Sequence, residues 1–129
     1  MSGLFIACIK INIHIKKELG NIGEQIAAEY LENNNYQIIK RNFYCKNGEI
    51  DIIAKDNNEF VFVEVKTRSS TNFGKPSEAV DCIKLKHLYK TAQYFLYKSN
   101  YSNKFIRFDV IEILIKNGKF NVNHIKQII

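Results

Sequence analysis

Length, composition and charge describe one basic globular domain. The chain has 129 residues, of which 46% are hydrophobic and 25% charged, and this balance excludes a disordered or fibrous protein. The 19 lysines and arginines outnumber the 13 acids and give a net charge of +6, which attracts polyanions such as nucleic acid or an anionic membrane. The three cysteines are odd in number and widely spaced. This pattern excludes a disulfide framework and a zinc site and indicates a reducing, cytoplasmic location.

Residues 1–17 differ in pattern from the rest of the chain. Their apolar start, LFIAC, is too short for a signal peptide or a membrane-spanning helix, so no membrane association is expected. Isoleucines then alternate with polar residues over 9–16, which predicts a strand with one buried face. We therefore treat 1–17 as an extension of a domain that spans 18–129. The extension is an added edge strand, a contact with a second subunit in a homodimer, or upstream sequence from a misassigned start.

A helix is predicted over 18–33 and a first strand over 36–45. Gly20 and Gly23 weaken this helix locally, which is tolerated where its backbone must lie close to another element. Glu24 lies on the flank of the helix that carries small and apolar residues, so its carboxylate can lean toward the sheet; a solvated glutamate is the alternative. The apolar residues that recur at helical spacing are Leu19, Ile22, Ile26 and Tyr30.

Two runs rich in β-branched residues, 49–55 and 60–68, predict a β-hairpin around the polar turn 56–59. A four-residue loop is common in hairpins and fixes the register of the two strands. The directly opposed pairs are then Lys55 with Phe60, Asp51 with Glu64, and Glu49 with Lys66.

This register would place two carboxylates side by side at the end of a buried strand. Phenylalanines line one face of the run 60–68 and valines line the other, so both faces are expected to be buried. Opposed residues have Cβ atoms about 4.5 to 5.5 Å apart, which would let Asp51 and Glu64 share one cation such as Mg²⁺ or Mn²⁺. Lys66 would then serve a phosphate or an attacking water. A solvated charged face is the alternative interpretation.

The loop after Arg68 is polar and holds the only proline of the chain. Loops beside a catalytic strand often contact substrate, so Arg68 and Lys75 are candidates for phosphate contacts, with a solvated loop as an equal alternative. Ser77 is a predicted N-cap for a helix that runs to about Lys98. That helix carries four lysines, three of which are expected to be solvated; these are Lys86, Lys90 and Lys98.

Two further strands are predicted at the end of the chain, over 105–115 and 120–125, joined by a turn at 117–119. Arg107 and Asp109 lie on one face of the first of these strands. We expect them to pair with each other in a structural role.

Five runs follow one another along the chain: GNIGEQIAAEYL (20–31), GEIDIIAKD (48–56), VFVEVKTR (61–68), FGKPSEAV (73–80) and RFDVI (107–111). Together they resemble the bacterial YraN-like family. Asp51, the Glu-x-Lys formed by Glu64 and Lys66, and the helix residue Glu24 also look like the motif of the PD-(D/E)xK nuclease superfamily, which includes restriction endonucleases and archaeal Holliday-junction resolvases. The resemblance covers roughly 19–115 and implies an α/β fold with a restriction endonuclease-like α-β-β-β-α-β core and a mixed sheet.

The resemblance implies a Mg²⁺- or Mn²⁺-dependent nuclease, a resolvase-like phosphodiester hydrolase acting on DNA that is possibly branched. Asp51 and Glu64, with the Val65 carbonyl, would hold the metal, and Glu24 would bind a water of its coordination sphere or a second ion. Lys66 would orient or deprotonate the attacking water. The family also tends to keep a lysine at the position of Lys84, which makes this residue a phosphate candidate.

Two other functions stay open at this point. One is a nucleic-acid-binding module that keeps the fold without cutting. The other is a structural or partner-binding protein in which the acids and the lysine form only an internal ion-pair network.

Overall fold

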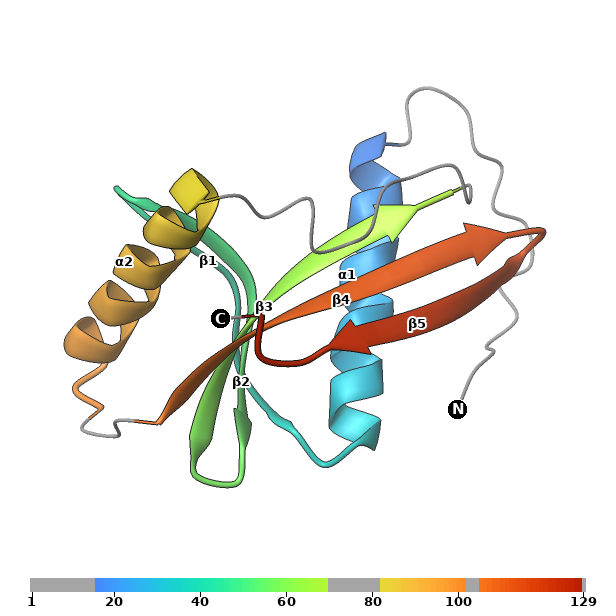
Figure 1. Cartoon of the computed structure of the whole chain (residues 1–129). Helices are drawn as coiled ribbons and strands as arrows, with labels where there is room; N and C mark the ends of the chain where they lie inside the picture. Colours follow the sequence, from blue (N-terminus) through green and yellow to red (C-terminus); the bar gives the residue numbers. More distant parts are fainter. Residues whose placement is uncertain (1–15, 70–81, 102–104, 129) are drawn as a thin grey trace.

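The computed structural model describes residues 16–69, 82–101 and 105–128 (Figure 1). All seven predicted elements from residue 18 onward are present, and the α-β-β-β-α-β core is confirmed, with one more strand at its end. The predicted N-terminal strand, the homodimer contact, Lys75 and the Ser77 cap lie outside the described residues. The elements are α1 (Lys16–Asn33), β1 (Gln37–Cys45), β2 (Gly48–Asp56), β3 (Glu59–Arg68), α2 (Cys82–Lys98), β4 (Ile106–Lys116) and β5 (Lys119–Ile125).

The five strands form one mixed sheet in the order β1-β2-β3-β4-β5. β3 and β4 are parallel, because the chain crosses over through α2 between them, and the other neighbours are antiparallel. Lys55 pairs with Phe60 as predicted. The pairing continues to Asp56 and Glu59, so the loop has two residues instead of the expected four, and Asn57 takes a left-handed φ of 55° to close it.

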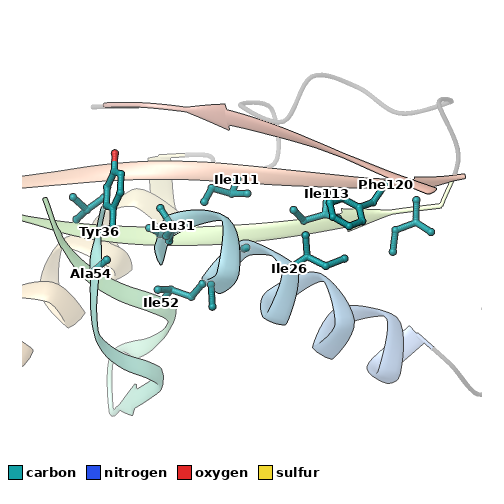
Figure 2. Close-up of a cluster of buried hydrophobic side chains, with 13 residues drawn as sticks. Ile26, Leu31, Tyr36, Ile52, Ala54, Ile111, Ile113 and Phe120 are labelled. Carbon is teal, nitrogen blue, oxygen red and sulfur yellow. The ribbon is translucent and has the colours of Figure 1, made fainter. Parts of the chain in front are cut away.

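The two helices cover opposite faces of the sheet, which buries β3 on both sides as predicted. Alternate residues of β3 join two separate apolar clusters. The cluster under α1 extends along the helix to β4 and β5, and Figure 2 shows its side chains between helix and sheet. Val61 and Val63 pack in this cluster with Ala27 and Leu31, while Phe60 and Phe62 pack with Leu88 and Phe95 of α2.

Gly23 is the point where α1 lies directly on β3. A Cβ atom built on Gly23 would be 1.7 Å from Thr67 Oγ1 and 3.0 Å or less from the Thr67 carbons, whereas one built on Gly20 would meet nothing within 4 Å. The expected close approach is therefore confirmed at Gly23 and not at Gly20. This contact fixes the position of the next residue, Glu24, relative to the end of β3.

Gly23→Ala and Gly20→Ala are therefore expected to change stability in opposite directions. Alanine at position 23 must push α1 away from Thr67, and overpacking of this kind costs about 1 to 3 kcal/mol, more than the helix propensity that alanine adds. Alanine at position 20 meets open space and should stabilise α1 by about 0.5 to 1 kcal/mol. Urea unfolding of the two variants measures both effects. Equal gains in both variants would contradict the docking of α1 on Thr67.

Candidate active site

Asp51 lies at the centre of a group of acids. Its Oδ2 atom accepts a hydrogen bond of 2.8 Å from the Val65 backbone N–H. Burial raises the pKa of Asp51 to about 7, with further contributions first from Glu64 and then from Glu24 and Glu49, while the Val65 bond acts in the opposite direction. Glu64, Glu24 and Glu49 are therefore close enough to Asp51 to disfavour its charge.

The predicted direct pairing of Asp51 with Glu64 is wrong in detail. The paired residues of β2 and β3 run from Ile52–Val63 to the hairpin turn. In a regular strand Ile50 and Ile52 would lie on the same face of the sheet. Instead, Ile50 packs in the cluster under α2 and Ile52 packs in the cluster under α1, so the alternation of side chains is broken at Asp51. The Val65 N–H donates its hydrogen bond to the Asp51 carboxylate instead of to a backbone carbonyl of β2.

Two lysines hold the Glu64 carboxylate. Lys84 Nζ is 2.5 Å and Lys66 Nζ is 3.2 Å from the same oxygen, Oε2. The predicted opposition of Glu49 and Lys66 does not give a salt bridge between them, because Lys66 pairs with Glu64, two residues away on the same face of its own strand. Lys84, the phosphate candidate on the second helix, thus lies beside Glu64.

The two lysines differ in pKa. Burial and the neighbouring ammonium of Lys84 lower the pKa of Lys66, against the attraction of Glu64. Burial also acts to lower the pKa of Lys84, but its interactions with Glu64, Lys66 and Asp51 together outweigh this effect, and the pKa of Lys84 is raised. Lys66 is thus the lysine that more readily gives up its proton, as a base must.

Glu24 reaches the same region from α1 and is half-buried. Burial raises its pKa, and Glu49 and Glu64 raise it further, while Arg41 and a hydrogen bond with Asn42 oppose the shift. Glu24 is therefore close enough to interact with these carboxylates, as its position on the helix suggested.

The acids fit a hard cation that is only partly bound by protein. Within residues 16–69, 82–101 and 105–128, no three His, Cys, Asp or Glu side chains are close enough to hold a metal ion by themselves. Mg²⁺ commonly takes only one or two protein carboxylates and fills its remaining positions with water and substrate phosphates. Asp51 and Glu64 supply oxygen donors of that kind.

Of the remaining candidates for phosphate contacts, Arg68 is the one that lies among the described residues. Arg68 Nε lies 3.6 Å from Glu112 Oε2 on β4, and both side chains are partly buried. Lys75 lies outside the described residues. The contacts of Arg68 therefore direct it toward β4.

Sequence reasoning missed a pocket of about 300 Å³ beside Glu64. It lies between α2 and the turn from β1 to β2, and Glu49, Glu64, Lys84, His87 and Thr91 line it. Gly48 has a φ of 145°, and a Cβ atom there would lie 3.5 Å from Thr91 Oγ1, so the turn packs closely on the helix. His87 is the histidine among these lining residues. Its spacing of three residues from Lys84, which places both on one side of the helix, was the signal that could have found it.

A second charged group is buried on β4, where Arg107 also contacts Asp56 and Glu59 beside the turn between β2 and β3. Arg107 and Asp109 pair through two hydrogen bonds of 2.9 and 3.0 Å, which confirms the structural pairing predicted from sequence. Asp109 also accepts a bond from the Gln127 N–H and contacts His124 Nε2 at 2.7 Å. Arg107 donates to the Tyr36 hydroxyl, which Figure 2 shows at the edge of the α1 cluster.

Asp51→Asn is expected to stabilise the metal-free protein at pH 8. An acid whose folded pKa is raised destabilises the fold above its unfolded pKa of about 3.9, and this loss grows until pH passes the folded value of about 7. The asparagine amide stays neutral and its oxygen can still accept the Val65 N–H. Urea unfolding in EDTA should therefore show a larger advantage for the variant at pH 8 than at pH 5. An equal stability of both proteins at pH 8 would argue against the clustering of acids.

The fold and the site define an α/β protein with a nuclease-like core that carries clustered acids and lysines at one end of its central hairpin. No helix in the described part of the chain is long and apolar enough to cross a membrane. The model of the uncharacterised protein family UPF0102 matches residues 23–113, and the chain belongs to this family. The YraN-like family predicted from the sequence is thereby confirmed.

Curated relatives are similar over nearly their whole length. The chain is 50% identical over 113 residues to a UPF0102 protein of Caldicellulosiruptor saccharolyticus, covering 86% of this chain and 96% of the relative. It is 49% identical over 116 residues to a UPF0102 protein of Clostridium botulinum, covering 88% and 94%. A UPF0102 protein of Caldanaerobacter subterraneus subsp. tengcongensis is 50% identical over 113 residues, covering 85% and 93%.

Proposed function

We propose that this protein is a cytoplasmic, metal-dependent DNA nuclease, a resolvase-like phosphodiester hydrolase. The observation that carries the proposal is the convergence of Asp51 and Glu64 with two ammonium groups at the end of the central hairpin. Glu64 helps to raise the pKa of Asp51, so a divalent cation would stabilise the charged Asp51 carboxylate, and the lysines beside these acids are suited to a phosphate. The net charge of +6 also favours a polyanionic substrate.

Mg²⁺ or Mn²⁺ at this site would polarise the scissile phosphate and lower the pKa of water. Asp51 and Glu64 would hold the ion, with the Val65 carbonyl as a third donor. The bond from the Val65 N–H holds Asp51 Oδ2 in place, so the orientation of this carboxylate is set by β3.

Different side chains would accept the proton of the attacking water and contact the phosphate. Lys66, with its lowered pKa, would take the proton from the attacking water. Lys84, whose pKa is raised, would keep its charge and neutralise a phosphate oxygen once the cation replaces it at Glu64. Glu24 would orient water from the α1 side.

A nucleic-acid-binding module without cleavage is the second candidate. One observation favours it: both lysines already neutralise Glu64 Oε2, so the carboxylate has charge partners without a metal. Such a module would bind DNA with a strong salt dependence and without any requirement for a divalent ion.

The test is an assay of the purified protein with branched, flapped and linear DNA in Mg²⁺, Mn²⁺ or EDTA. The nuclease proposal expects cleavage with a divalent ion, none in EDTA, and none from Asp51→Ala or Lys66→Ala. Cleavage that survives both substitutions would overturn the proposed site. DNA binding that is unchanged by EDTA and by Lys66→Ala, with no cleavage, would establish the second candidate.

A further inference from the structure

The outer face of α2 combines lysines with tyrosines and contains no acid. Residues 82–98 include four lysines and three tyrosines but no Asp or Glu. Lys86, Lys90, Tyr94 and Lys98 recur every four residues, and Tyr97 lies seven residues after Lys90. These five side chains therefore share one face of the helix. We call this set the lysine–tyrosine face: Lys86, Lys90, Tyr94, Tyr97 and Lys98, all of which are exposed.

The tyrosines of this face present their rings to solvent. Tyr97 is 84% exposed and Tyr94 is 38% exposed. The Tyr94 ring is supported from behind by Phe43, at a centroid distance of 6.3 Å, and Lys98 Nζ lies 5.8 Å from its centroid. Such supported, exposed rings among cations are suited to stacking on a partner that also carries negative charge.

The face lies on the helix that also supplies two residues of the candidate active site. Lys84, which contacts Glu64, and His87, which lines the pocket, belong to the same helix. At a rise of about 1.5 Å per residue, Tyr97 lies about 20 Å along the helix axis from Lys84. A strand bound at Glu64 could therefore follow α2, which lies outside β1 and β2 in Figure 1.

We propose that the lysine–tyrosine face binds an unpaired strand of nucleic acid next to the site of cleavage. This inference rests on the nuclease function proposed above and specifies its substrate class. Lysines would contact the phosphates and Tyr94 and Tyr97 would stack on the bases, a combination typical of proteins that bind single strands. A duplex keeps its bases stacked inside, so the tyrosines would gain nothing from it.

Charge and apolar pattern separate this partner from two others. A second copy of the chain would bring the same positive face against this one, with repulsion between the lysines. A membrane-binding helix inserts a broad apolar face into lipid, but Leu88, Ala92 and Phe95 of α2 are buried against the sheet. Ile83, which is 68% exposed, is a single aliphatic side chain and does not form such a face. Nucleic acid supplies both the negative charge and the stacking surface.

The test compares single-stranded and duplex oligonucleotides of equal length by fluorescence anisotropy in EDTA, where no cleavage is expected. The paired substitution Tyr94→Leu and Tyr97→Leu should lower the affinity for the single strand at least about 10-fold, since each stacked base contributes severalfold or more, and should change duplex affinity less than about 2-fold. Lys86→Gln with Lys90→Gln should weaken the binding and its salt dependence. Because Tyr97 is so exposed, Tyr97→Leu by itself tests the face without a folding defect.

Two matched controls are available. Tyr44→Leu removes a 67% exposed tyrosine from β1, and Lys116→Gln with Lys119→Gln removes two exposed charges at the turn between β4 and β5. The proposal expects smaller effects from both controls than from the corresponding α2 variants.

An unchanged single-strand affinity in the tyrosine variants, or an equal loss for duplex, would overturn the proposal. Preferential, tyrosine-dependent binding to vesicles that contain phosphatidylserine, or tyrosine-dependent self-association without strand binding, would also overturn it. If the tyrosines are needed for strand binding but no divalent ion supports cleavage, the proposed nuclease function is rejected, while the proposed role of the lysine–tyrosine face in binding is retained.

Discussion

Replacing Lys66 with methionine is expected to lower the rate of DNA cleavage by about 10²- to 10⁴-fold, the usual contribution of a general base. Methionine keeps the unbranched, apolar stem of lysine but cannot accept a proton from water. Lys84 remains on Glu64, so the variant keeps one of the two ammonium contacts of this carboxylate. Affinity for DNA measured in Ca²⁺ or EDTA should therefore change much less than the rate. Lys119→Met, at an exposed position of β5, is the matched control and should leave the rate unchanged.

Lys66→Arg separates a base from a positive charge. Arginine keeps its proton at every accessible pH, so it can replace a phosphate donor but not a base. The wild-type rate should rise with pH as Lys66, whose pKa is lowered, loses its proton, and this rise should disappear in the arginine variant. An arginine variant with wild-type rate and pH profile would assign Lys66 to phosphate binding and leave the base to another group.

The elements of this fold could be predicted because each signal is local. Helical spacing in α1, β-branched runs in β2 and β3, and the polar residues of the turn are all visible in short windows of sequence. The register at Lys55–Phe60 followed from the turn and was correct. The same register was wrongly extended to Asp51. There the Val65 N–H donates to the Asp51 carboxylate and not to a backbone carbonyl, and a count of residues along two strands does not show this change.

The parts that could not be predicted depend on residues far apart in the chain. The pocket joins Glu49 and Glu64 to His87 of α2, and their approach is set by how the helix packs on the sheet. The buried network likewise joins Tyr36 and His124 to the pair Arg107 and Asp109. Only the pairing within one strand, which needs a spacing of two residues, was visible from the sequence.

Asp109→Ala is expected to cost about 3 to 5 kcal/mol of folding free energy, because it leaves Arg107 buried without its main partner. The Asp109 side chain is 0% exposed, and both of its oxygens are used: Arg107 and Gln127 donate to Oδ1, and Arg107 and His124 contact Oδ2. A domain of ordinary stability, about 5 to 15 kcal/mol, would lose much of its margin. Urea unfolding at pH 7 measures the change.

Asp56→Asn is the control, since it removes a different carboxylate from the same arginine. Asp56 Oδ2 lies 3.3 Å from Arg107 Nη1, but the Asp56 side chain is 30% exposed, and such pairs contribute only about 0 to 1 kcal/mol.

Asp109→Asn keeps the shape of the residue and isolates the effect of its charge. Burial acts to raise the pKa of Asp109, but the bonds from His124, Arg107 and Gln127 outweigh it, so the pKa is lowered. Its stabilisation is present above the unfolded pKa of about 3.9 and is lost as pH falls through the lower folded value. The difference between wild type and Asp109→Asn should therefore shrink only in strong acid, and equal losses for Asp56→Asn and Asp109→Asn at pH 7 would contradict a buried network centred on Asp109.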